Sequence, residues 1–254
     1  MTTRRDEIAN HLRDLITSGT YAPGDVLPNQ TSMKATYQTT SNTISAAVKI
    51  LRDEGLIWRV ANRGLIVQDT RPLYIDLSMA TTPSNGLGPW ETACHNVGRT
   101  GSMQLVSVDR GPAEAEVARA LQLSVGATVV RRDRRALVDG QAVMLDTGYY
   151  PLALVDDTPV AGSGKVGGGT LAALIAAGVL DPQTTRVRER IGARAATKDE
   201  AETLRLRPGV SVLTAERVTR DGEAQPVELL QRVANARRIR FQTDDLSLRN
   251  LGQP

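Results

Sequence analysis

Apolar residues in the N-terminal part of the chain recur at helical spacing and predict three short amphipathic helices. The first helix ends before Gly19, and its apolar face consists of Ile8, Leu12, Leu15 and Ile16. Asn29 or Thr31 can cap a second helix, and this helix carries Met33 and Tyr37 on its inward face. The third helix follows a short polar stretch and is closed by Gly55, and its apolar face consists of Ile44, Ala47, Val48 and Leu51.

Two short β-type runs after the third helix predict a hairpin. Residues 56–60 and 65–67 flank Ala61-Asn62-Arg63-Gly64, in which Asn and Gly tolerate the positive φ of a tight turn. Three helices and such a hairpin form a winged helix-turn-helix. DNA is then the first partner to test, because one helix fits the major groove and a basic hairpin can reach the flanking backbone. The alternative is a three-helix bundle whose hairpin serves protein contacts.

Turn-forming residues separate this first domain, residues 1–70, from the rest of the chain. The segment 71–89 contains Arg71-Pro72 and a run rich in Gly, Pro, Ser and Thr, although residues 73–78 within it are compatible with one short strand. We therefore predict a linker over 71–89, a second domain over 90–245 and a C-terminal tail over 246–254.

A diffuse repeat organises the second domain. Leu121-x-Leu123, Gly126, Val129, Arg134 and Asp139-Gly140 recur 83 positions later, or nearly so, as Leu204-x-Leu206, Gly209, Val212, Arg217 and Asp221-Gly222. Each unit has the pattern of a helix, a turn, a strand, an Asp-Gly hairpin and a second strand. Two such hairpins can share one antiparallel sheet with helices covering one face. The fold class is therefore α+β.

A glycine-rich loop lies between the two repeats. Gly167-Gly168-Gly169 runs into a helix that Thr170 can cap, and free backbone N–H groups at such a point can hold an anion. A tight turn without a ligand explains the same glycines equally well.

Composition and charge exclude several classes of protein. The chain has 254 residues, 41% hydrophobic content and a net charge of +3, so DNA affinity must come from local clustering and from two copies acting together. One cysteine, Cys94, rules out an internal disulfide, and with only His11 and His95 beside it we expect no metal site. No apolar run approaches the roughly 20 residues that span a bilayer, and the N-terminus lacks the apolar core of a signal peptide. We expect a cytoplasmic protein with no membrane partner.

The first domain resembles the DNA-binding domain of GntR-family transcriptional regulators. The residues that carry the resemblance are Gly19-x-x-x-Pro23-Gly24, Leu27-Pro28, Thr43-Ile44, Ala47-Val48, Leu51, Glu54-Gly55-Leu56-Ile57 and Arg63-Gly64. The chain departs from the family at Thr31, Ser41 and Ser45, where arginine is common, and at Gln30, where Glu is common. Because arginine contacts guanine bidentately, worth roughly 1–3 kcal/mol of discrimination, the operator should differ from the usual guanine-containing half-site.

Ten residues are predicted to contact this operator. Asn42 can pair with adenine, and Thr43 can contact phosphate or a thymine methyl group. Ser41 and Ser45 either contact DNA or are simple polar residues on a solvated face. The full set is Thr31, Lys34, Ser41, Asn42, Thr43, Ser45, Lys49, Arg59, Asn62 and Arg63, in which the lysines and arginines would neutralise phosphates.

The second domain resembles the effector-binding UTRA domain of the HutC subfamily of GntR regulators, a mixed α/β domain with the chorismate lyase fold. The carrying residues include Val129 to Arg134, Asp139-Gly140, Tyr150-Pro151, Gly169-Thr170-Leu171, Ala193-Arg194-Ala195 and Pro226-Val227-Glu228. The resemblance implies a small polar or anionic effector. It would be held by Arg132, Arg134, Thr170 and Glu228, with Arg194 as a further candidate. Alternatively, residues 131–135 form a solvated strand edge.

We therefore expect a homodimeric repressor that an effector releases from double-stranded operator DNA, with no cofactor and no catalytic residues. Two alternatives stay open. A regulator that lacks the usual arginines could have lost operator recognition and act through protein contacts. A chorismate lyase-like enzyme shares the second fold, but the sequence offers no histidine near the arginines and no evident nucleophile–base pair.

Overall fold

The chain divides into two compact units, Met1–Arg71 and Pro72–Pro254. The computed structural model describes residues 3–76, 87–206 and 209–242. The C-terminal tail predicted for residues 246–254 lies outside the described residues.

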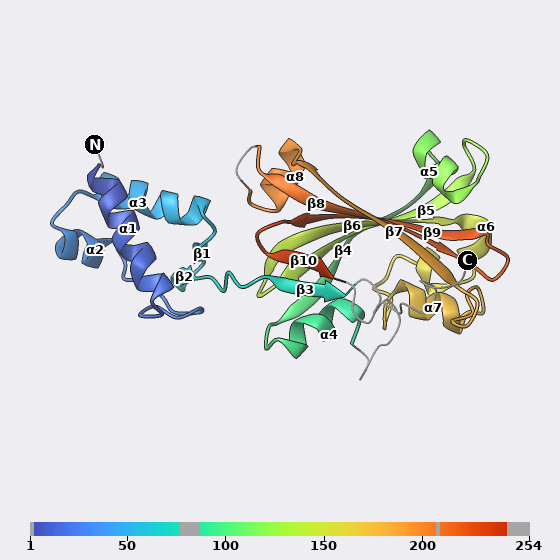
Figure 1. Cartoon of the computed structure of the whole chain (residues 1–254), viewed down its shortest axis with the longest axis horizontal. Coiled ribbons are helices and arrows are strands. Elements are labelled where there is room, and N and C mark those ends of the chain that lie inside the picture. Colours follow the sequence, from blue (N-terminus) through green and yellow to red (C-terminus); the bar gives the residue numbers. More distant parts are fainter. Residues whose placement is uncertain (1–2, 77–86, 207–208, 243–254) are drawn as a thin grey trace, which may run out of the picture. The chain divides into compact units, whose positions relative to one another are not determined.

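Three helices and one hairpin make up the first unit (Figure 1). They are α1 (Arg4–Thr17), α2 (Gln30–Tyr37), α3 (Ser41–Asp53), and the antiparallel pair β1 (Ile57–Val60) and β2 (Gly64–Val67). The side chain of Asn29 caps α2 by accepting the backbone N–H of Ser32 at 2.9 Å, and Thr40 caps α3 in the same way. The hairpin turn places Asn62 at φ 61° and Gly64 at φ 98°. The winged helix-turn-helix predicted from the sequence is confirmed.

The core of the first unit consists largely of apolar positions that the helical pattern selected, although Leu15 is only partly buried and does not belong to it. Ile8, Leu12, Ile44 and Leu51 are almost fully buried and pack together, with Met33 of α2 among them. This packing holds α3 against α1 and leaves the opposite side of α3 in solvent.

A six-stranded antiparallel sheet forms the centre of the second unit, with the strand order β4-β5-β6-β9-β8-β7. Its strands are β4 (Gly101–Pro112), β5 (Thr128–Val138), β6 (Gln141–Pro151), β7 (Arg186–Ala195), β8 (Ser211–Arg220) and β9 (Pro226–Asn235). The repeat predicted from the sequence corresponds to the hairpins β5–β6 and β8–β9, which are joined where β6 pairs with β9.

The two hairpin turns differ, although both contain Asp-Gly. Asp139 and Gly140 both have positive φ, at 50° and 78°, so the first turn is tight and follows the prediction. The second connection is the longer loop of residues 221–225, where Ala224 rather than Asp221 adopts positive φ, at 67°.

Helices cover both faces of the sheet, so the expectation that they cover one face was wrong (Figure 1). Val129 packs with α5 (Ala115–Leu121), whereas its neighbour Val130, which points to the other face, packs against α7 (Thr170–Ala176). Near its start β5 is therefore apolar on both faces, and this is what a two-sided covering requires. The other helices of this unit are α4 (Pro89–Asn96), α6 (Leu152–Val155), α8 (Lys198–Thr203) and the 3-10 turn η1 (Pro159–Ala161).

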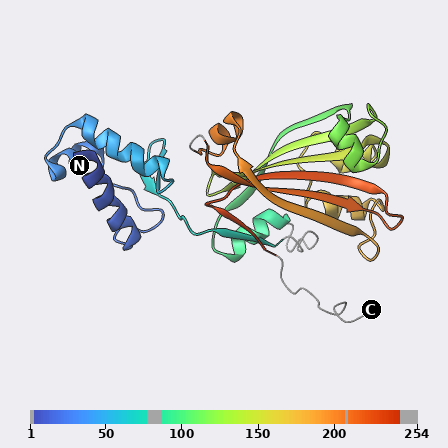
Figure 2. The ribbon, with the colours of Figure 1, turned by 45° about the horizontal axis from the view of Figure 1, so that its top comes forward.

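Part of the predicted linker 71–89 belongs to the second unit. β3 (Leu73–Asp76) pairs in parallel with β10 (Ile239–Gln242), and α4 begins at Pro89 (Figure 2). The buried side chains of Leu73 and Ile239 explain why these residues are ordered together. Residues 77–86 of that linker lie outside the described residues.

Candidate functional site

The first unit presents a polar surface on α2, α3 and the hairpin. On α3, Asn42, Ser45 and Lys49 are exposed, and Ser41 and Thr43 are partly buried. The other predicted contact residues are also exposed, namely Thr31 and Lys34 on α2, and Arg59, Asn62 and Arg63 on the hairpin. The predicted DNA-contacting residues thus all reach solvent at least in part.

Three of these side chains, those of Thr43, Ser45 and Lys49, already have partners within the protein, and Ser45 accepts from Gln30 at 2.9 Å. The hydroxyl of Thr43 lies 3.0 Å from that of Thr40, the residue that caps α3, and Lys49 donates to Asp53 at 2.8 Å. An exposed pair spaced four residues apart on a helix contributes only about 0.3–0.5 kcal/mol, so phosphate can compete for Lys49.

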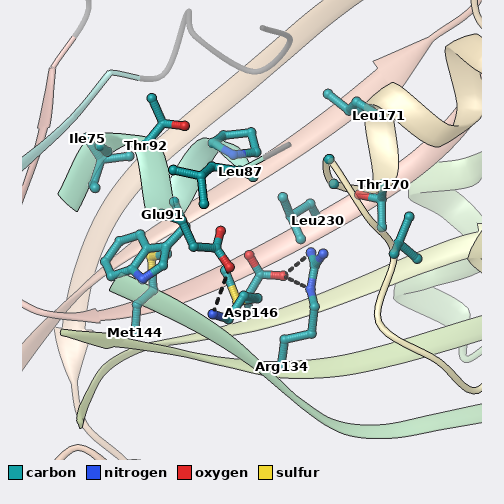
Figure 3. A pocket seen from close by; sticks show the side chains of 18 of the residues that line it. Ile75, Leu87, Glu91, Thr92, Arg134, Met144, Asp146, Thr170, Leu171 and Leu230 are labelled. Carbon is teal, nitrogen blue, oxygen red and sulfur yellow. Dashed lines mark hydrogen bonds and ion pairs between the residues drawn. The ribbon is translucent and has the colours of Figure 1, made fainter. Parts of the chain in front are cut away.

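The second unit contains a pocket of about 600 Å³ on one face of the sheet (Figure 3). Its floor is formed by strands β4, β5, β6, β8 and β9, and its walls by β3, α4, the glycine-rich loop and the start of α7. Apolar side chains make up part of the lining, including Ile75, Trp90, Met144, Leu171 and Leu230. The arrangement suits a small molecule that has both a polar and an apolar part.

Arg132 brings a positive charge to this pocket without a carboxylate beside it. It is 1% exposed, and its guanidinium donates to the carbonyl oxygens of Val160, Gly162 and Gly164 at 2.6–2.8 Å. Its Nε has no hydrogen-bond partner among the described residues. Burial lowers the pKa of Arg132, because water no longer solvates the charge.

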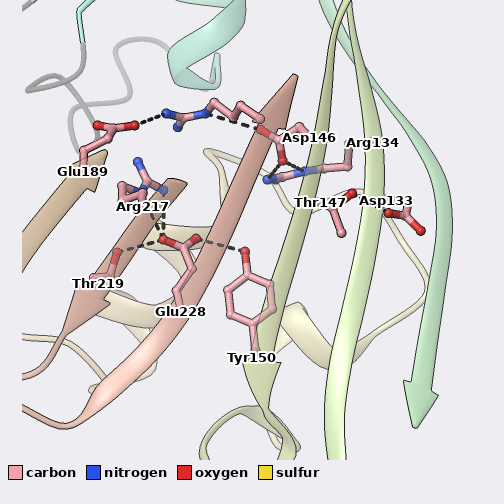
Figure 4. A network of polar contacts seen from close by, with 10 residues as sticks. Asp133, Arg134, Asp146, Thr147, Tyr150, Glu189, Arg217, Thr219 and Glu228 are labelled. Atoms are coloured by element: carbon pink, nitrogen blue, oxygen red, sulfur yellow. Dashed lines mark hydrogen bonds and ion pairs between the residues drawn. The ribbon is translucent and has the colours of Figure 1, made fainter. Parts of the chain in front are cut away.

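The remaining cations on the pocket floor are neutralised in a chain of ion pairs (Figure 4). Arg134 donates through Nε to Asp146 at 3.0 Å, and Arg232 lies between Asp146 and Glu189, at 3.7 Å and 2.8 Å. Burial alone would lower the pKa of Arg134, but the Asp146 carboxylate outweighs it and the net shift is upward. Arg134 is therefore a charged but compensated group on the pocket floor.

Glu228 lies beneath the pocket and does not line it. Its side chain is fully buried, and it accepts hydrogen bonds from Arg217 at 2.9 Å, Thr219 at 2.8 Å and Tyr150 at 3.0 Å (Figure 4). Arg217, which does line the pocket, is held by this carboxylate. Glu228 is thus placed to position Arg217 and not to touch a ligand.

The structure separates the two other predicted effector residues. Thr170 is 5% exposed, stands at the first position of α7 and lines the pocket. Arg194 lies on the edge strand β7, outside the pocket lining, and pairs with Glu200 through two bonds of 2.7 Å and 2.6 Å. Glu200 also closes the capping box of α8 with Thr197, so this pair ties β7 to α8.

Several pocket residues were missed by the sequence prediction. Arg217 could have been found, because the internal repeat places it at the position equivalent to Arg134. No sequence pattern indicated Asp146 and Arg232 as pocket residues, because a charged residue on a strand ordinarily faces solvent. Lys165 and Glu91 form an ion pair of 3.0 Å in the pocket wall. They come from a loop and a helix whose proximity could not be predicted from the sequence.

The described residues hold no group of three or more His, Cys, Asp or Glu side chains placed to bind a metal ion. Among the described helices, none has the length and the apolar character to cross a membrane.

Comparison with known proteins relates both units to named families. Residues 4–67 match the family described as bacterial regulatory proteins of the gntR family, and residues 96–240 match the UTRA domain. An uncharacterised HTH-type transcriptional regulator of Rhizobium meliloti is 28% identical over 96% of this chain and 92% of its own. Another from Streptomyces coelicolor is 30% identical over 87% of this chain and 85% of its own. A crystal structure assigned to a GntR-family transcriptional regulator superposes with a TM-score of 0.60 and 26% identity, covering 96% of this chain and 98% of that one.

Proposed function

Because the chain belongs to the GntR family of transcriptional regulators and carries a UTRA domain, we propose that it is a repressor whose operator affinity falls when a small anionic molecule occupies the pocket of the second unit. The observation that carries the proposal is the buried, uncompensated charge of Arg132 on the pocket floor. We assign the protein to the HutC subfamily because its DNA-binding domain is followed by a UTRA domain.

The chemistry of the operator contacts follows from the exposed residues of the first unit. Asn42 on α3 would pair with an adenine in the major groove, and Arg63 at the hairpin turn would bind the flanking phosphates or the minor groove. Lys34, Lys49 and Arg59 would supply further phosphate contacts, whereas Thr31, Ser41, Thr43, Ser45 and Asn62 supply neutral hydrogen bonds. Specificity would then depend on amides, hydroxyls and DNA shape more than on arginine–guanine pairs.

The charge balance of the pocket supports an anionic effector. Arg134, Arg217, Arg232 and Lys165 each have a carboxylate partner, so their charges cancel within the protein. Arg132 has only carbonyl oxygens, which satisfy its N–H groups but leave one positive charge. A carboxylate or a phosphate ester would supply the missing negative charge, with Thr170 as a hydroxyl partner and the apolar wall for the rest of the molecule.

The pocket wall also offers a route from effector to DNA-binding unit. β3 contributes Tyr74 and Ile75 to the pocket, and it begins at Leu73, just after the first unit ends at Arg71. The residues that precede β3 can adopt more than one conformation. An effector that touches β3 would have a different affinity for each of these conformations. That difference in affinity is what shifts the population between operator-binding and released states.

A homodimer completes the proposal. The small net charge of +3 makes binding by one copy weak, and two copies related by a twofold axis would read half-sites about one helical turn apart on a near-palindromic operator.

A gel-shift titration with DNA from upstream of the protein's own gene tests the proposed function. We expect a sequence-selective complex whose affinity falls as salt rises, because phosphate contacts release counterions. Binding that is equal for this DNA and for a scrambled duplex of the same composition would refute operator recognition.

A further inference from the structure

Gln30, the first residue of α2, connects this helix to α3, the helix that carries most of the predicted operator contacts. Its Nε2 donates to Oγ of Ser45 at 2.9 Å and to the backbone oxygen of Ser41 at 3.1 Å. Both Gln30 and Ser45 are exposed, on the same side of the unit as the predicted operator contacts of α3. They are also two of the positions at which the sequence departs from the GntR pattern, and in the structure these two departures touch each other.

The hydrogen bonds fix which way the Gln30 amide points. The carbonyl oxygen of Ser41 can only accept, so the NH₂ group and not the oxygen of the amide must face it. Both N–H groups of Nε2 are then used within the protein. Across the described parts of the chain, no donor reaches Oε1 of Gln30, which is left as a free acceptor in solvent.

Ser45 supplies the complementary group. Its oxygen accepts from Gln30, so its own O–H remains to donate, and within the described residues it has no other side-chain partner. The exposed surface of α2 and α3 thus carries one acceptor, Oε1 of Gln30, beside one donor, the hydroxyl of Ser45.

We propose that Gln30 and Ser45 together read a single base of the operator, with adenine preferred. In the major groove adenine offers a donor at N6 and an acceptor at N7, which match the Gln30 acceptor and the Ser45 donor. Cytosine offers only the donor at N4, whereas guanine and thymine present acceptors that would face the lone pairs of Oε1. The expected order is adenine, then cytosine, then guanine and thymine. This inference rests on the proposed operator binding.

The test begins with the full-length wild-type protein and a randomised duplex pool. The selected duplex is then made with each of the four bases at every half-site position, and its affinity is measured by fluorescence anisotropy. At one position of each half-site we expect adenine to bind roughly 5- to 150-fold more tightly than guanine or thymine, the range of one good two-point base contact.

Two variants divide the contact into its parts. Gln30→Ala should abolish the base preference at that position and leave the other positions unchanged. Ser45→Ala removes the donor to N7 but keeps the acceptor, so adenine and cytosine should become equal while both stay ahead of guanine and thymine. Gln30→Glu keeps the shape and an acceptor but cannot donate to Ser41 or Ser45. Its carboxylate can accept the Ser45 hydroxyl, which then no longer donates to N7, so adenine should lose its advantage over cytosine.

Two further variants serve as controls. Gln104→Ala, an exposed glutamine on β4 of the second unit, should bind every duplex as the wild type does. Lys34→Ala should weaken binding to all duplexes by the same factor, because a phosphate contact carries no base information. If the wild type selects a duplex and Gln30→Ala keeps every base preference, the inference is overturned while the proposed function stands. If the wild type selects no duplex, both are overturned.

Discussion

Arg217 and Arg134 occupy equivalent positions in the two hairpins, yet each is neutralised by a carboxylate from a different place in its repeat. Asp146, which pairs with Arg134, lies directly opposite it on β6, whereas Glu228, which holds Arg217, lies opposite Thr219 on β9. The two repeats therefore share a buried arginine at the same position, whereas the carboxylates that neutralise these arginines lie at different positions. Arg132, which has no carboxylate, is the residue that gives the pocket its net charge.

Removing the carboxylate of Glu228 should destabilise the second unit strongly. Glu228→Gln leaves Arg217 as an uncompensated buried charge, and such changes cost about 3–5 kcal/mol. Urea denaturation followed by circular dichroism measures the loss. Glu202→Gln is the matched control, because Glu202 forms only an exposed pair with Lys198 at 4.0 Å, and its change should stay within about 0.5 kcal/mol. Equal losses of unfolding free energy for the two substitutions would show that the buried pair contributes no more to stability than the exposed one.

Cys94 should be unreactive in the folded protein. Its side chain is fully buried, and burial raises the pKa of the thiol from 9.0 to about 12, so the reactive thiolate is scarce at neutral pH. We expect labelling by a thiol reagent at pH 8 to follow unfolding and to accelerate in urea. The raised pKa also has a consequence for stability: the contribution of the neutral thiol is complete below pH 9 and is lost as the pH rises toward 12. Rapid labelling in buffer alone would contradict the burial of Cys94.

Asn42 and Lys34 should affect operator binding in different ways. Asn42→Ala should cost roughly 1–3 kcal/mol of discrimination at one base, because an amide can pair bidentately with adenine. Lys34→Ala should leave the base preference intact and reduce the slope of log affinity against log salt concentration by about 0.9, the value for one phosphate contact. Anisotropy titrations at several salt concentrations separate the two quantities. The distinction fails if Lys34→Ala changes base preference or Asn42→Ala changes only the salt slope.

Local patterns predicted the first unit well because its elements are short and close in sequence. The apolar spacing of Ile44, Ala47 and Leu51 indicated which face of α3 is buried, and Asn62 with Gly64 indicated the hairpin. In the second unit the repeat predicted both central hairpins, since each pairs strands that are neighbours in the chain.

Features that depend on distant parts of the chain were beyond such patterns. The parallel pairing of Leu73 with Ile239 joins the two ends of the second unit, and nothing local to either strand indicates the other. The pocket depends on which of two adjacent arginines faces inward. Arg131 is exposed and Arg132 is buried, but this follows from the strand register and from helices on both faces, which the residues 131–135 do not reveal.

Arg132 also offers a matched pair of variants for testing the effector site. Arg132→Met removes the uncompensated charge from the pocket, whereas Arg131→Met removes the neighbouring arginine, which is exposed and lies on the opposite face of β5. We expect Arg132→Met to bind the operator as the wild type does but to lose its response to anionic ligands. Since Arg132→Met also leaves three carbonyl oxygens without their donor, a thermal melt should confirm that the variant is folded before the response is measured.

The most direct test of effector control is operator affinity measured with and without an anionic ligand. A thermal-shift screen of small carboxylates and phosphate esters supplies the ligand, because a compound at 100 times its Kd adds roughly 2.7 kcal/mol to stability. The strongest hit is then added to wild type, Arg131→Met and Arg132→Met during anisotropy titrations with the operator duplex. We expect the hit to weaken operator binding at least 10-fold for the wild type and for Arg131→Met, and to leave Arg132→Met unchanged. An equal loss of affinity in all three proteins, or no loss in the wild type, would contradict control of DNA binding by an anion at Arg132.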